Sequence, residues 1–316
     1  MGGWVYRKIF LYEINYCWAL GFWLYGFKII ASARIDMKVA GILSTLGKVD
    51  IEPLLISLCN QTYPISQLVV VDQGPSQHVE ASCKEYSNRL NITYVKSEER
   101  GASRGRNLGL SLADCGAVFF PDDDCHYKAD FVGKLVAAVA DGYGFASGMV
   151  FTNENGDCGR LPIKLGMRQD IVKSNLLYAF IEFTFLITTQ ALGRERFNPL
   201  MGVGSGTPAG SDEGADLLMR LLERGVKGIF VPDAIAYHPD KVDLVDESVL
   251  RRARSYATGR GYLLKSHWFG IRILTRELLR PVIGFFLYLI IADYKRARYY
   301  YNVAYGKFRG LFLRLQ

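Results

Sequence analysis

Three consecutive acids, Asp122-Asp123-Asp124, come directly after the apolar run Ala117–Phe120. Like charges this close repel, and two unit charges about 4 Å apart cost roughly 4 kcal/mol at an effective dielectric constant of about 20. A divalent cation removes that cost, and carboxylate ligands without sulfur partners favour Mg²⁺ or Mn²⁺. The alternative is a solvated loop that caps the following helix. The three acids therefore predict a metal site at the end of a buried strand.

A further acid, Asp72, ends the apolar run Gln67–Val71. Short apolar runs alternate with helical patterns along the chain, which predicts a parallel sheet covered by helices on both faces. In open sheets of this kind, ligands bind beyond the carboxyl ends of the strands. We therefore expect Asp72 and the three acids at the same edge of the sheet. The predicted helices are Ile51–Asn60, Ala102–Ala113, Asp130–Ala140 and residues 213–224.

Two later regions are less regular. Residues 152–210 show no clear periodicity and are rich in Gly and Pro near their end. The last strand is predicted at Gly228–Val231, with a turn at Pro232-Asp233, because proline and aspartate favour turns. We expect the acceptor site in the irregular stretch.

Five segments, taken in order, resemble glycosyltransferase family 2. The resemblance covers roughly residues 38–240 and implies the glycosyltransferase A (GT-A) fold, a Rossmann-like, mostly parallel sheet with helices on both faces. It also implies Mn²⁺ or Mg²⁺ and inversion at the anomeric carbon. A UDP-, dTDP- or GDP-sugar would donate its sugar to a hydroxyl of a glycan or lipid-linked acceptor. The segments are QTYPISQLVVVDQG, GASRGRNLGLSLA, VFFPDDDC, GSDEGADLLMRLLERG and VPDAIAYHP.

The resemblance assigns the acids and a histidine to the donor and the metal. Asp72 matches the acid that contacts the nucleotide base, and Asp124 matches the metal ligand. Asp122 matches the residue that contacts the ribose or a water molecule bound to the metal. If the alignment of the motif is shifted, Asp123 becomes a metal ligand. His238 stands where some members have a metal ligand, and imidazole with two carboxylates suits Mn²⁺. The alternative is a histidine hydrogen-bonded on a loop.

Basic residues are the candidates for holding the donor diphosphate. Arg104 and Arg106 lie on the helix before the metal strand, and guanidinium groups match phosphate oxygens. The alternative is an exposed helix face. Arg254 belongs to the basic segment 251–267, which is expected to close over the donor phosphates or to bind lipid headgroups.

The candidate base lies just before the predicted helix 213–224. The family usually shows Glu-Asp, one further residue and then Asp-Leu. Aligning residues 216–217 with that last pair puts Glu213 on the Glu and Gly214 on the catalytic Asp, whose carboxylate is therefore missing. Glu213 is the favoured base, and a shift of one residue makes it Asp212. The alternative is that both residues only favour the start of a helix.

Charge is unevenly distributed along the 316 residues, which carry a net charge of +7. From residue 241 onward, 15 Lys and Arg stand against 5 Asp and Glu, so residues 1–240 carry −3. Apolar runs lie between these basic residues. They favour an anionic membrane surface over nucleic acid as the partner, and no nucleic-acid binding is predicted.

Three domains follow from these patterns. Residues 1–37 are expected to be an apolar membrane-interface or anchoring segment, or alternatively an amphipathic helix packed on the domain. The resemblance implies that residues 38–240 are the GT-A catalytic domain, and residues 241–316 are expected to be a basic, apolar, helical membrane-associated extension. Its charge-free stretch Pro281–Ala292 is too short to span a bilayer, which takes about 20 residues. The expected location is the cytoplasmic face of the bacterial inner membrane.

Other protein classes fit the sequence less well. No GxGxxG follows the first strand, which disfavours a dehydrogenase, and no GxxxxGK[ST] loop is present. The main alternative is a catalytically degenerate, membrane-associated nucleotide-sugar-binding protein of the same fold. Gly214, at the usual position of the base, keeps that alternative open.

Overall fold

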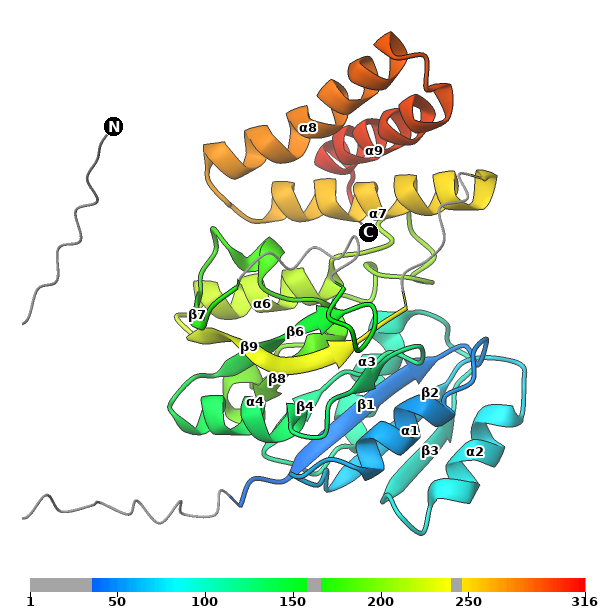
Figure 1. The fold of residues 1–316 in the computed structure, drawn as a ribbon, viewed down its shortest axis with the longest axis vertical. Coiled ribbons are helices and arrows are strands. Elements are labelled where there is room, and N and C mark those ends of the chain that lie inside the picture. The colour runs from blue at the N-terminus through cyan, green and yellow to red at the C-terminus, as the bar shows by residue number, and fades with distance from the viewer. Residues whose placement is uncertain (1–35, 158–165, 240–245, 316) are drawn as a thin grey trace, which may run out of the picture. The chain divides into compact units, whose positions relative to one another are not determined.

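The apolar runs form the strands of a mixed sheet in the computed structural model (Figure 1). The structure describes residues 36–157, 166–239 and 246–315, and residues Ile35–Gln316 form one compact unit. The predicted N-terminal segment 1–37 lies almost entirely outside the described residues. The predicted boundary between residues 240 and 241 also falls outside them, so both domain predictions remain predictions.

The described strands run in the order β3-β2-β1-β4-β8-β6-β9-β5, and β7 pairs with β9. The half from β3 to β4 is parallel, whereas β8 runs antiparallel to both of its neighbours. β6 and β9 are parallel to each other, and β5 and β7 are antiparallel to β9. The strands are β1 (Val39–Thr45), β2 (Gln67–Asp72), β3 (Ile92–Lys96), β4 (Ala117–Phe119), β5 (His126–Tyr127), β6 (Phe145–Phe151), β7 (Gln169–Ile171), β8 (Phe185–Thr188) and β9 (Gly228–Tyr237).

Helices pack on the sheet, and three long helices follow it in the chain (Figure 1). The central sheet with its helices matches the predicted fold class, although the sheet is mixed and not mostly parallel as predicted: β8, β5 and β7 run antiparallel to the strands they pair with. The helices are α1 (Glu52–Cys59), α2 (His78–Tyr86), α3 (Ala102–Leu112), α4 (Phe131–Ala140), α5 (Thr189–Leu192), α6 (Glu213–Glu223), α7 (Glu247–Ser266), α8 (Ile271–Ile290) and α9 (Tyr294–Phe312), with short 3₁₀ helices η1 (Leu176–Tyr178) and η2 (Glu182–Thr184).

The core lies between the sheet and its helices. The central strands contribute side chains without exposed surface, because parallel strands in such a sheet are covered on both faces. The predicted apolar runs therefore correspond to buried strands. Examples are Ile42, Leu43, Val69, Val70 and Val118.

Strand β9 differs from its prediction. It does not turn at Pro232-Asp233 but continues to Tyr237. The pairing with β6 shifts there, from Gly148 opposite Val231 to Met149 opposite Ile235. A bulge of this kind accommodates a proline, which cannot donate a ladder hydrogen bond, without ending the strand.

Helices α7 and α9 cross with their backbones in contact. A Cβ added at Gly261 would stand 2.1 Å from the Lys307 carbonyl oxygen, and one at Gly310 would stand 2.2 Å from the Thr258 carbonyl oxygen. Only glycine allows this approach. Within the described part of the chain, no helix combines the length and the apolar character needed to cross a membrane.

Candidate active site

The acids that the sequence singles out gather at one edge of the sheet. Strand β1 pairs with both β2 and β4, so the ends of these strands adjoin. Thr45, the last residue of β1, pairs with Asp72 at the end of β2, and its hydroxyl donates a hydrogen bond to Asp123 after β4. The strand order therefore brings the second acid and the acidic triplet to the same edge.

Asp72 is fully enclosed by protein groups. One carboxylate oxygen accepts from the Gly74 amide at 2.8 Å, and the other accepts from the Tyr94 hydroxyl at 2.9 Å and the Lys96 ammonium at 2.8 Å. Its exposed fraction is 0%. The carboxylate thus braces the loop after β2, and its predicted contact with a nucleotide base remains a prediction that requires this loop to rearrange.

Asp124 and His238 form a close pair. The histidine Nε2 lies 3.1 Å from the Asp124 Oδ1, and both side chains are mostly buried. His238 directly follows the bulged end of β9, and the Phe183 ring stacks on its imidazole with centroids 5.1 Å apart. The pairing of β5 with β9, in which His126 lies opposite Tyr237, thus places His238 beside the acids that precede β5.

The donor set at this pair suits a hard divalent cation. Two ligands about 3 Å apart fit adjacent corners of an octahedron with metal–ligand bonds of about 2.1 Å. Carboxylate and imidazole are also the ligand types that suit Mn²⁺. Asp122 lies two residues away. Among the described residues, no group of three or more His, Cys, Asp or Glu side chains is already arranged around one point as a complete metal site.

Arg106 connects the acidic triplet to the predicted base. From α3, its guanidinium donates to Glu213 at 2.7 Å and to Asp122 at 3.2 Å, and it packs over the Phe197 ring. Burial opposes its charge, but Glu213 and Asp122 more than offset this and raise the pKa of Arg106. Burial raises the pKa of Asp122, against the influence of Arg106. Arg106 is thus enclosed between two carboxylates.

Arg104, predicted beside the diphosphate, instead binds backbone. Its guanidinium donates to the carbonyl oxygens of Arg100 and Ser205, each at 3.1 Å. The Ser103 hydroxyl holds the same glycine-rich loop through the Met201 carbonyl at 2.7 Å. The first turn of α3 therefore holds residues 201–206 through these hydrogen bonds. Diphosphate binding by Arg104 remains a prediction.

That loop encloses Glu213. A Cβ at Gly202, whose φ is +95°, would stand 2.7 Å from the Glu213 carboxylate carbon. Only glycine suits both this φ and this contact. Glu213 is 4% exposed. The residue that the sequence favours as the base is therefore buried under the loop and paired with Arg106.

Asp212, the second candidate base, is fixed by α7. Its φ of 66° is left-handed, and the Arg260 guanidinium grips one carboxylate oxygen through Nε at 2.9 Å and Nη2 at 2.7 Å. The Ser211 hydroxyl donates to the other oxygen at 2.8 Å. Arg254 does not join this group: it donates to Asn302 and packs over the Tyr305 ring on α9. The segment predicted to close over phosphates is a regular helix in this structure.

Glu182 is a site residue that the sequence reasoning missed. It begins η2, within the irregular stretch 152–210, and its side chain lies against Gly214 at the start of α6. Burial, with a further contribution from the negative charge of Glu213, raises the pKa of Glu182 to about 8. No motif surrounds it in the sequence, so only the three-dimensional fold reveals its position.

Comparisons with known proteins agree with this geometry. Residues 48–198 match the model of glycosyl transferase family 2. The chain is 33% identical over 88 residues to the glycosyltransferase GlyA of Streptococcus pneumoniae, covering 28% of this chain and 13% of that protein. It is 34% identical over 85 residues to the hyaluronan synthase of Pasteurella multocida, covering 26% and 7%. The chain thus spans only a small part of these relatives.

Solved structures show the same fold. The mannosyltransferase PcManGT of Pyrobaculum calidifontis, solved with GDP-Man and Mn²⁺, has a TM-score of 0.56 at 17% identity, over 86% of this chain and 87% of that one. TarS 1–349 of S. aureus, solved with UDP-GlcNAc, has a TM-score of 0.52 at 17% identity, over 86% and 90%. Residues 48–198 therefore resemble glycosyl transferase family 2, and the described residues adopt the GT-A fold.

Proposed function

We propose that the chain is an inverting glycosyltransferase that moves a sugar from a nucleotide-sugar donor to a hydroxyl group of a glycan or lipid-linked acceptor. The observation that carries the proposal is the acidic cluster at the end of β4. There, Asp124 pairs with His238 and Asp122 is joined through Arg106 to the acids at the start of α6. Solved neighbours that hold UDP-GlcNAc and GDP-Man support a nucleotide-sugar donor.

The chain's own residues supply three parts of such a reaction. Asp124 and His238 would hold a divalent cation, with Asp122 beside them, and that ion would neutralise charge on the leaving diphosphate. Arg106 holds the carboxylates in place through its two ion pairs. One carboxylate beside α6 takes the proton of the acceptor hydroxyl as that oxygen attacks the anomeric carbon, which contributes about 10²–10⁴ in rate.

Calorimetry with UDP, GDP, dTDP and CDP, each with and without Mn²⁺, tests the donor site. We expect one nucleotide to bind in the presence of Mn²⁺ and Asp124→Ala to abolish that binding. Asp114→Ala is the matched control, because this exposed acid forms its ion pair with Lys38, away from the cluster. Absence of binding to all four nucleotides would overturn the proposal.

Turnover distinguishes an enzyme from a binding protein of the same fold. Release of nucleoside diphosphate from the donor, measured with Mn²⁺, is expected for the wild type and lost in Asp124→Ala. A wild type that binds the nucleotide sugar but releases no diphosphate, with or without a glycan acceptor, would instead identify a catalytically degenerate nucleotide-sugar-binding protein.

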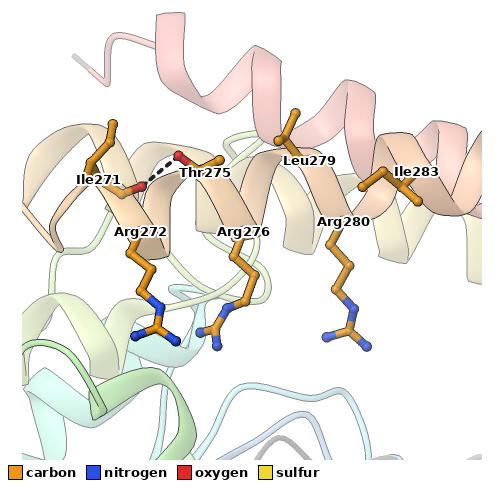
Figure 2. A pocket seen from close by; sticks show the side chains of 7 residues that line it. All are labelled: Ile271, Arg272, Thr275, Arg276, Leu279, Arg280 and Ile283. Atoms are coloured by element: carbon orange, nitrogen blue, oxygen red, sulfur yellow. Dashed lines mark hydrogen bonds between the residues drawn. The ribbon is translucent and has the colours of Figure 1, made fainter.

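We further propose that α8 lies on an anionic membrane, at the cytoplasmic face of a bacterial inner membrane. Arg272, Arg276 and Arg280 recur every fourth residue, and Figure 2 shows their guanidinium groups extending to the same side of the helix. Beside them, a second row contains Ile271, Leu279 and Ile283, which are 68%, 49% and 63% exposed. Together with Thr275, the two rows line an open pocket of about 530 Å³. Arginines next to exposed apolar side chains suit phosphate headgroups above acyl chains.

Vesicle sedimentation of the full chain tests this surface. Binding is expected to vesicles containing phosphatidylglycerol and not to phosphatidylcholine alone, and Arg272→Ala/Arg280→Ala should reduce it by about thirtyfold, at about 1 kcal/mol per basic residue. Lys84→Gln/Arg89→Gln on and after α2 removes the same charge and should bind like the wild type. Equal loss in both double variants would mean that net charge, and not this surface, drives binding.

A further inference from the structure

Position 214 lacks a side chain, but the space beside it is filled. A Cβ added at Gly214 would stand 2.9 Å from the Cγ of Glu182 and 3.1 Å from its Oε1. Glu182 comes from η2, which lies more than thirty residues earlier in the chain. Its carboxylate therefore lies where a side chain at position 214 would extend from the first turn of α6.

The other acids beside α6 are already paired. Glu213 is buried and accepts from Arg106, and Asp212 is buried and held by Arg260. Glu182 is partly exposed, and within residues 36–157, 166–239 and 246–315 no cationic side chain forms an ion pair with it. Of these three carboxylates, it alone is both accessible and unpaired.

The backbone at Glu182 is fixed next to the Asp124–His238 pair. The residue that follows it, Phe183, stacks on the His238 ring, and the Tyr127 hydroxyl donates to the Phe183 carbonyl at 2.9 Å. The fully buried Thr184 hydroxyl lies 2.9 Å from that of Ser147 on β6. Phe183 thus contacts the candidate metal ligand His238, and the preceding residue, Glu182, contacts the start of α6.

We propose that Glu182 is the general base of the transfer, in place of the carboxylate that position 214 lacks. This inference rests on the proposed function. A base on η2 is attached next to Phe183, which stacks on His238, and places its carboxylate against the first turn of α6. The reacting hydroxyl is thereby expected to lie between η2 and the donor.

The step balances without any further reagent. The acceptor oxygen forms a bond to the anomeric carbon while the bond from that carbon to the diphosphate oxygen breaks, and its electron pair leaves with the diphosphate. The hydroxyl proton passes to a Glu182 carboxylate oxygen. Glu182 ends the step as a neutral carboxylic acid and returns the proton to water after the products leave.

The charges around Glu182 support this role. Glu213 and Asp212 face it from the start of α6 and disfavour its ionised form, whereas Arg106 on α3 favours that form. From α7, the Arg260 guanidinium and the Tyr256 phenol also interact electrostatically with Glu182. Burial and the neighbouring acids raise its pKa to about 8, which suits a base that works near neutral pH.

The first test is Glu182→Gln in the full chain. With UDP-GlcNAc or GDP-mannose and Mn²⁺, and water or a glycan as acceptor, release of nucleoside diphosphate should fall by about 10²–10⁴. Nucleotide affinity by calorimetry should stay within about threefold, because the change affects the base and not the donor site. The wild-type rate should rise with pH up to about 8, and Glu182→Gln should lose that rise.

Glu213→Gln is the matched comparison, because it makes the same change on the adjacent acid. We expect it to retain the rise of rate with pH, since Glu213 positions Arg106 and takes no proton. A Glu182→Gln variant with near-normal turnover, or a pH rise lost in Glu213→Gln alone, would overturn the assignment of Glu182 while leaving the glycosyltransferase function intact.

A relocation variant tests the geometry itself. Gly214→Asp alone should impair turnover, because its side chain meets Glu182. Glu182→Ala/Gly214→Asp should recover at least tenfold over Glu182→Ala, since a carboxylate then occupies the same space from α6. No recovery in a double variant that folds and binds nucleotide would overturn the proposal. A wild type that binds nucleotide but releases no diphosphate would instead overturn the proposed function.

Discussion

Arg106 and Arg280 carry the same guanidinium group in opposite surroundings. Arg106 is 5% exposed and forms ion pairs with Glu213 and Asp122, whereas Arg280 lies on the exposed face of α8, where no carboxylate within the described residues pairs with it. Buried charges at the sheet edge are satisfied by one another and fix the geometry of the site. Arg280 is therefore available to a partner, whereas Arg276 on the same helix packs over the Tyr178 ring and Glu277 pairs with Lys307.

Removing the buried arginine should have the largest effect on folding. Arg106→Ala leaves Glu213 buried without its cation, and breaking a buried pair typically costs about 3–5 kcal/mol. Urea denaturation should show a loss of this size in the free energy of unfolding. A loss below about 1 kcal/mol would mean that water or another cation replaces Arg106. The buried arginine would then stabilise the fold no more than the exposed arginines of α8 do.

The contact between α7 and Asp212 should have the next largest effect. Arg260→Ala removes a two-pronged charged hydrogen bond from a buried aspartate with a left-handed backbone. We expect the free energy of unfolding to fall by about 1.5–3 kcal/mol and turnover to fall with it. Arg252→Ala, on the same helix and exposed, is the control. Unchanged turnover in Arg260→Ala would separate Asp212 from catalysis.

His267 adds a pH-dependent contribution. It ends α7 and lies 2.9 Å from Asp216 on α6. Burial alone would lower its pKa, but Asp216 and Glu223 raise it above its ordinary value of 6.5. The stabilisation is therefore fully present below pH 6.5 and is lost as the pH rises through the higher folded-state value. His267→Ala should lower Tm more at pH 6 than at pH 9, by a few degrees. An equal loss at both pH values would contradict this.

The exposed arginines should have the smallest effect on folding. Arg272→Ala/Arg280→Ala should change Tm by no more than about 2 °C, because substitutions on an exposed helix face remove few contacts. The same variant is expected to lose vesicle binding. A large drop in Tm would show that these arginines stabilise the fold, and the proposed separation of roles would not hold.

Much of the sheet edge could be predicted from the sequence because its signals are local. Apolar runs followed directly by Asp72 and by Asp122-Asp123-Asp124 indicate strand ends, and the parallel arrangement brings such ends together. The start of α6 at Glu213 was also predictable from its acidic residues and helical spacing. Each of these features depends on neighbours within a few residues.

The remainder depends on contacts between distant segments. Proline at 232 indicates a turn, but pairing with β6 keeps β9 extended through a bulge. Glu182 reaches the site because η2 is held by Tyr127 and Ser147, and no local pattern reports those contacts. Arg260 contacts Asp212 only because α7 packs against the loop before α6.

The glycine crossing of α7 and α9 has a consequence for anyone who shortens this chain. Without α9, the Glu277 carboxylate loses Lys307, and α7, which carries Arg260, loses the helix against which it is packed. A cut at the apparent border near residue 240 would remove Arg260 entirely. The last helices are therefore expected to unfold together with the sheet in a single cooperative transition. A truncated catalytic domain should lose the contact of Arg260 with Asp212, which holds the start of α6.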